Sequence, residues 1–168
     1  MASMSPGGGR RIDPGTMLKA LVAIDLAKPA AATRLVGLAR DLLPVSAYTF
    51  DLVYVVDQPA PAFMSADLSE RLRQTAPRRE QEAKTELDRI RTQYALRGQA
   101  FIIEDPDLAH ALLERARRYD VLVVGARDGR SVGWFASTTP QRLVRTAQVP
   151  LLTIPMGSDP KPPSKPKP

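Results

Sequence analysis

Small and hydroxyl-bearing residues gather in one segment of the chain, residues 121–140, which reads VLVVGARDGRSVGWFASTTP. Its apolar start leads into Gly125, Gly129 follows four positions later, and Ser-Thr-Thr stands at residues 137–139. In a loop that runs from a strand to the start of a helix, backbone N–H groups can cradle a phosphate group. The segment therefore predicts an anion-binding loop.

Residues for covalent or metal chemistry are scarce elsewhere. The chain has no cysteine, which excludes disulfides, thiolate metal sites and cysteine nucleophiles. Its one histidine, His110, stands among alanines and leucines, where a packed or surface role fits better than catalysis. The sequence also has no phosphate loop with a Walker lysine. These patterns point to binding rather than to hydrolysis.

Five short apolar runs, rich in β-branched residues, predict strands. They are too short for helices and nearly continuous in apolar character, which is typical of parallel strands buried on both faces. The five runs are Leu21 to Ile24, Leu52 to Val56, Phe101 to Ile103, Val121 to Val124 and Leu151 to Ile154.

Helical patterns fill the intervals between these runs. The first begins at Pro29 and presents Leu35, Leu38 and Leu42 at helical spacing. The second is long and polar, from about Ala66 to Leu96, and Pro77 should kink it or divide it in two. Its C-terminal part carries an apolar stripe that consists of Ala83, Leu87, Ile90 and Tyr94.

The last two helices have their own start signals. Asp105 is the expected N-cap of the third helix, with Pro106 in its first turn and Leu108, Leu112 and Ala116 facing inward. A fourth helix should start near Pro140 and carry Leu143, Val144 and Ala147 before the last strand.

This alternation predicts an α/β domain with a βαβαβαβαβ order. The expected architecture is a five-stranded parallel sheet, doubly wound in a Rossmann-like or flavodoxin-like manner, with helices on both faces. In such sheets, ligands bind outside the carboxyl ends of the strands, where the strand order reverses. Site residues are therefore expected in the loops at that edge.

The segments together resemble the universal stress protein family, which has an adenine nucleotide alpha hydrolase-like fold. That family has an apolar strand, a Gly-x2-Gly-x9-Gly-Ser/Thr loop, a helix, a proline and a final strand. Similar segments here are LVAIDLA in the first strand, LVYVVD in the second and EDPDLAHALLERARRYDVLVVG before the loop. The resemblance covers nearly all of residues 17–155.

The resemblance implies a site for an adenine nucleotide, ATP or AMP, with Mg²⁺ arriving only with the nucleotide. Asp25 and the backbone of Ala23 would contact adenine, and Val55 would pack on the base. The remaining contacts, to ribose and phosphates, would come from Gly125, Arg127, Gly129, Ser137, Thr138 and Thr139. Enzymatic activity is not expected, beyond at most a weak incidental ATPase.

The loop departs from the family pattern. Asp128 stands where the second glycine belongs, Gly129 comes one position late, and the interval to the helix is one residue short. Ser137 replaces the last glycine, and Pro140 stands where nucleotide-binding members have a hydroxyl residue. One backbone donor and one side-chain donor are thereby lost, and an aspartate near a triphosphate adds repulsion.

Two hypotheses follow. In the first, a degenerate loop still binds ATP or AMP, and the domain responds to it. In the second, the chain is a dimeric interaction module of the same fold that has lost the ligand and acts through protein partners. Structural roles also stay open, because Asp25 can cap its loop, the two glycines can shape a turn, and Thr138 can cap the fourth helix.

Composition sets the boundaries. Residues 1–16 and the Pro/Lys-rich tail 156–168 are poor in apolar side chains, so we expect both to be flexible and residues 17–155 to fold. These segments carry about half of the formal net charge of +6, and the rest alternates with acidic residues, as on solvated helix faces rather than nucleic-acid surfaces.

Location and partners are expected to follow from the same features. No apolar run is long enough to span a bilayer, and a cytoplasmic location is expected. The resemblance implies a homodimer through the final strand, PLLTIP, and the tail could recruit a protein partner.

Overall fold

The computed structural model describes residues 15–56, 65–126 and 138–156, with side chains left out for 138–141. The described residues form a single five-stranded sheet in the order β3-β2-β1-β4-β5, and every neighbouring pair is parallel. The strands are β1 (Leu18–Ala23), β2 (Tyr48–Val56), β3 (Ala100–Glu104), β4 (Val121–Ala126) and β5 (Leu151–Pro155). The predicted α/β class is confirmed, and the strand order is the Rossmann-like one rather than the flavodoxin-like one.

Burial is deepest at the centre of the sheet. The last four residues of β1 and the first five of β4 are buried, as expected for strands covered on both faces. The edge strands β3 and β5 consist mostly of half-buried and exposed residues. The sequence pattern of an edge strand is the same as that of a central one, so only the strand order separates them.

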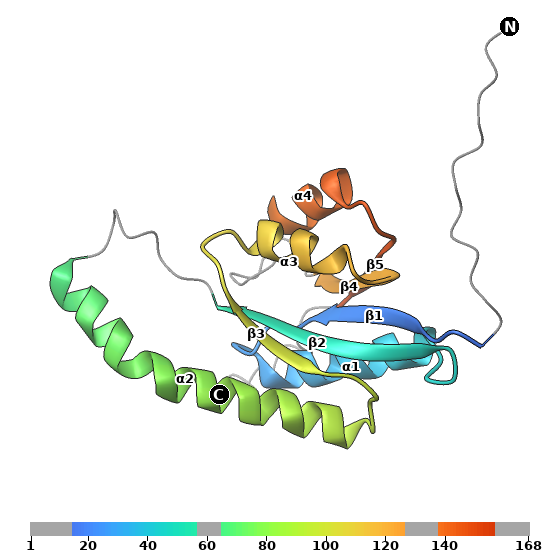
Figure 1. Ribbon diagram of the computed structural model, residues 1–168, viewed down its shortest axis with the longest axis horizontal. Coiled ribbons are helices and arrows are strands. Elements are labelled where there is room, and N and C mark those ends of the chain that lie inside the picture. Colours follow the sequence, from blue (N-terminus) through green and yellow to red (C-terminus); the bar gives the residue numbers. More distant parts are fainter. Residues whose placement is uncertain (1–14, 57–64, 127–137, 157–168) are drawn as a thin grey trace, which may run out of the picture.

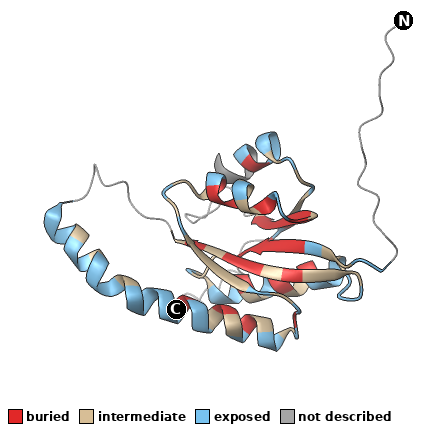
Figure 2. Ribbon diagram, viewed as in Figure 1, coloured by how far each residue is buried: buried red, intermediate tan, exposed pale blue. Residues whose placement is uncertain are grey.

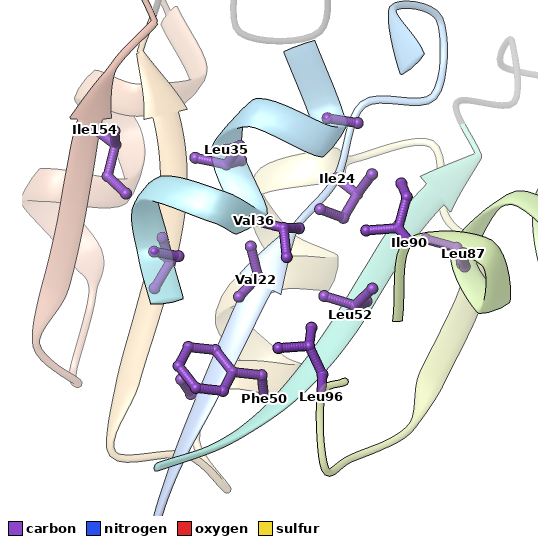
Figure 3. Close-up of a cluster of buried hydrophobic side chains, with 14 of the residues drawn as sticks. Val22, Ile24, Leu35, Val36, Phe50, Leu52, Leu87, Ile90, Leu96 and Ile154 are labelled. Carbon is purple, nitrogen blue, oxygen red and sulfur yellow. The ribbon is translucent and has the colours of Figure 1, made fainter. Parts of the chain in front are cut away.

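Helices α1 (Pro29–Leu42) and α2 (Ala66–Gln93) cover one face of the sheet (Figure 1). Side chains of alternate strand positions meet them there, and Figure 3 shows Val22 beside Val36 of α1 and Leu52 between the two helices. The buried members from the two helices are Ala32, Leu35, Val36, Ala39, Leu87 and Ile90.

Helices α3 (Leu108–Ala116) and α4 (Thr138–Thr146) cover the opposite face. Leu112 of α3 and Leu143 of α4 are fully buried there, against the strand positions that alternate with those of the first cluster. The strand members of this second cluster are Leu21, Ala23, Val53, Val55, Leu122 and Val124.

Two apolar residues that we expected to face inward are exposed. Leu42 is 58% exposed because the inward stripe of α1 continues from Ala39 to Leu43, four residues on. Val144 is 66% exposed because its neighbour Leu143 takes the position that faces the sheet. Adjacent helix positions point in different directions, so only one of each pair can be buried.

Of the two expectations for Pro77, a kink or a division, α2 is not divided: it runs through Pro77 as one helix of 28 residues and bends along its length (Figure 1). One helix boundary differs from expectation. The N-cap of α3 is Asp107 rather than Asp105: the Asp107 side chain accepts from the His110 N–H, at 3.1 Å. Asp105 accepts instead from the Asp107 N–H, at 2.7 Å, and so makes the turn that precedes the helix.

The N-terminal half of α2 extends past the carboxyl edge of the sheet (Figure 1), and its residues are mostly exposed (Figure 2). Ion pairs between neighbouring turns cover this part, such as Arg73 with Glu70 and Arg78 with Glu82. The prediction of a solvated charged face is confirmed for these residues. The projecting helix forms a wall beside the edge where ligands are expected.

Candidate functional site

The strand order reverses at β1, which lies between β2 and β4. At such a point, the connections that leave neighbouring strands go to opposite faces of the sheet. The crevice between them, at the carboxyl ends of the strands, is the usual ligand position in this architecture. A small hollow lies there between β1, β4 and the start of α1. Its lining includes three of the predicted site residues, Ala23, Asp25 and Gly125. The structure therefore brings together residues that are about 100 positions apart in the chain.

Asp25 shapes the loop that leaves β1. Its Oδ1 atom accepts a hydrogen bond from the Ala27 N–H at 2.9 Å, so the capping role considered from the sequence is present. Within the described residues, Oδ2 has no hydrogen bond. One oxygen therefore fixes the loop while the other remains able to accept from a ligand.

Gly125 faces Met156, the residue after β5. A Cβ atom on Gly125 would lie 3.0 Å from Met156 Cγ, closer than side chains normally approach. Met156 is held by two backbone contacts: its N–H donates to Ala126 O at 2.8 Å, and its O accepts from Arg34 Nη1 at 3.0 Å. At 6% exposure, Met156 is part of the core beside α1.

The hollow is consequently small. About 20 Å³ is open to the centre of a water molecule, slightly above the roughly 10–15 Å³ that holds one water. A purine ring would fit only after a side chain moved, and Met156, with its unbranched thioether, can change rotamer most readily. Sequence reasoning missed Met156 and Arg34, because nothing in their local patterns ties them to the loop.

Val55 does not line the hollow. It is fully buried in the second cluster, with Ala23 and the inward residues of α3 and α4. It stands near the carboxyl end of β2, and its side chain packs on protein atoms in this structure.

Helix α4 is tied to the start of α3. Arg142 Nη1 and Nη2 donate to Asp107 Oδ1 and Oδ2, at 3.2 and 2.9 Å. The hydrogen bond from Arg142, followed by that from the His110 N–H, holds the pKa of Asp107 below its ordinary value. This pair joins the middle of α4 to the N-cap of α3. Thr138 and Thr139 are the first two residues of α4, and their side chains lie outside the description.

Several predictions fall on residues outside the described ranges. These are the loop residues Arg127, Gly129 and Ser137, residues 1–14 of the N-terminal segment and residues 157–168 of the tail. Among described residues, His110 lies on the surface, with Nδ1 3.5 Å from Asp105 Oδ2. No group of three potential metal ligands occurs in the described ranges, and no described helix is long and apolar enough to cross a membrane.

The family model of universal stress proteins matches residues 17–155. This chain belongs to the universal stress protein family. Solved structures agree with the match: a family member from Burkholderia pseudomallei is 25% identical, with a TM-score of 0.57 over 84% of this chain and 99% of that one. No match was found among curated proteins.

Two further structures have the same fold. The universal stress protein UspA from Lactobacillus plantarum is 21% identical, with a TM-score of 0.59 over 84% of this chain and 99% of that one. A universal stress protein family member from Arabidopsis thaliana, with AMP bound, is 18% identical, with a TM-score of 0.59 over 88% and 97%. At these identities the likeness concerns the fold alone.

Proposed function

We propose that this universal stress protein is a nucleotide-responsive regulatory domain that binds AMP or ATP weakly between β1 and β4 and does not act as an enzyme. The observation that carries the proposal is the convergence of Ala23, Asp25 and Gly125 on one hollow at the point where the strand order reverses. Asp25 offers an acceptor for an amino or hydroxyl donor, and Gly125 allows close approach of a ligand to the backbone.

Structural neighbours support the ligand class. Bound AMP is present in the Arabidopsis thaliana protein, cAMP in another universal stress protein, and dAMP in one from Archaeoglobus fulgidus. The shared part of these ligands is adenine with a sugar and one phosphate. We infer that a monophosphate is favoured here, because Asp128 would repel a triphosphate more strongly, and Mg²⁺ would enter only with ATP.

Weak binding has two physical causes. The altered loop lacks two donors, each worth roughly 1.5–3 kcal/mol to a charged group, which lowers affinity by about two to four decades. Met156 must also leave the space beside Gly125. Its displacement costs part of the binding free energy, since the apolar side chain loses its packing.

The test is isothermal titration of the full chain with AMP, Mg-ATP and cAMP, paired with thermal unfolding. We expect saturable binding of AMP that is abolished in Gly125→Asp and tightened in Met156→Ala, which enlarges the hollow. A ligand at about 100 times its Kd stabilises the native state by about 2.7 kcal/mol, so each variant is compared with its own ligand-free baseline. Absence of binding by both the native chain and Met156→Ala would refute the proposal.

The alternative is a dimeric interaction module that has lost the ligand. Two observations favour it: Met156 lies against Gly125 in the hollow, and β5 lies at the edge of the sheet, where a second copy could pair. Sedimentation, combined with the titrations above, distinguishes this module from the nucleotide-binding domain. For the module, the expected result is a dimer that binds none of the three nucleotides. Recruitment of a protein partner by the tail and a cytoplasmic location stay predictions.

A further inference from the structure

A second and larger recess lies on the face of the sheet that α1 and α2 cover. It holds about 560 Å³ between the middle of α2, the carboxyl end of β2 and the loop before α1. Its nine lining residues are Leu26, Ala27, Pro29, Tyr54, Val56, Arg79, Glu82, Ala83 and Glu86. None of them lines the hollow beside Gly125, so the two are separate. We call this recess the α2 groove.

The walls of the α2 groove follow from the fold. Tyr54 and Val56 are alternate positions of β2 and point to the same face, away from Val55. Arg79, Ala83 and Glu86 recur at four and three residues, so they form one stripe of α2. This stripe overhangs the strand end because α2 begins beyond the sheet (Figure 1). The floor is apolar, and the charges stand on the helix side.

The charges of the α2 groove are unequally paired. Glu82 Oε1 accepts from Arg78 Nε at 2.8 Å, and Glu86 Oε1 accepts from Arg89 Nη2 at 2.6 Å. Arg79 has no hydrogen bond or ion pair with any described residue. Both carboxylates are therefore offset by neighbouring arginines, and Arg79 is the groove's uncompensated charge.

The charge of Arg79 also affects Tyr54, which lines the same groove. Burial, and then the charge of Asp25, raise the pKa of the Tyr54 phenol, whereas the charge of Arg79 lowers it. The guanidinium group therefore acts on the aromatic wall of the groove. An anion beside Arg79 would also lie near the Tyr54 ring.

We propose that the α2 groove binds a small aromatic anion, such as an aromatic carboxylate or sulfonate. The ring system would lie on Leu26, Pro29 and Val56 beside Tyr54, and the anionic group would pair with Arg79. The volume falls within the range of about 300–1,000 Å³ that small-molecule sites occupy. This site does not depend on the nucleotide proposal, because it uses other residues on another part of the edge.

The probe is 8-anilinonaphthalene-1-sulfonate, whose fluorescence rises in an apolar site, titrated into the folded full chain. We expect one saturable site, with an affinity that falls about ten- to a hundredfold in Arg79→Gln through loss of a charge-assisted contact. Arg73→Gln is the matched control: it removes the same charge from α2 at a position where neither the arginine nor its ion-pair partner Glu70 lines the groove, and it should leave the affinity within about twofold.

Two further measurements test whether the affinity depends on the anionic group and on this groove. The uncharged analogue N-phenyl-1-naphthylamine should bind the native chain and Arg79→Gln equally, because it has no anion to pair. Excess AMP should not displace the sulfonate, whatever happens at Gly125. Equal sulfonate affinity in the native chain, Arg79→Gln and Arg73→Gln would overturn the proposal, and so would displacement by AMP.

Discussion

Tyr119 joins α3 to β2 at the end of the sheet opposite the proposed sites, and we predict that Tyr119→Phe destabilises the fold without changing ligand binding. The Tyr119 hydroxyl group donates to Asp51 Oδ2 at 2.7 Å, and Asp51 Oδ1 accepts from the Gln99 N–H at the same distance. Tyr119 itself is only 6% exposed. The carboxylate therefore links three segments of the chain.

The magnitude follows from the kind of bond. A hydrogen bond to a charged group contributes about 1.5–3 kcal/mol, and Tyr119→Phe removes it while keeping the ring. For a chain of this length the loss corresponds to a decrease in Tm of about 3–12 °C. Tyr48→Phe is the control, because the Tyr48 hydroxyl group has no hydrogen bond with any described residue. This substitution should change the free energy of unfolding by less than about 0.5 kcal/mol.

The same bond predicts a pH signature. Burial first, and then the hydrogen bond to Asp51, raise the pKa of Tyr119 from 10.0 to about 12. The raised pKa means that the folded state holds the proton more tightly, so the contribution is complete below about pH 10 and is lost as the pH rises to about 12. Denaturant unfolding across this range should show a loss of stability in the native chain and Tyr48→Phe that is smaller in Tyr119→Phe. Equal pH dependence in all three would refute the reasoning.

Two further predictions concern the scaffold and the α3–α4 contact. Gly98 has a φ of +149°, and a Cβ atom there would lie 2.1 Å from Phe50 O. Gly98→Ala should therefore lower the free energy of unfolding by about 2–4 kcal/mol, measured by chemical denaturation. Gly15→Ala is the control and should lower it much less, because φ is also positive there but no atom lies within 4 Å of the added Cβ. Asp107→Asn keeps a capping side chain but removes the ion pair with Arg142. Because the folded pKa of Asp107 is lowered, its contribution is present above the ordinary value of 3.8 and is lost as the pH falls through the lowered one. The stability difference between the native chain and Asp107→Asn should therefore shrink in acid, and a constant difference would contradict the assignment.

The sequence by itself determined the elements and their order. All five strands and all four helices occur where the apolar patterns place them, because strand and helix periodicity depend on residues close in the chain. The same patterns predicted a binding edge at the carboxyl ends of the strands, and Ala23, Asp25 and Gly125 do meet there. Local patterns failed at Leu42 and Val144, where neighbouring positions compete for one buried place.

Only the tertiary structure decided which residues complete the sites. Met156 lies against Gly125 because β4 and β5 are neighbours in the sheet, and Arg79 and Tyr54 line one groove because α2 packs beside the end of β2. Such contacts join residues far apart in the chain, and their distances depend on strand order and helix position rather than on spacing. The sequence pattern therefore determines the order of strands and helices, whereas packing at the carboxyl edge determines the volume that is open to a ligand.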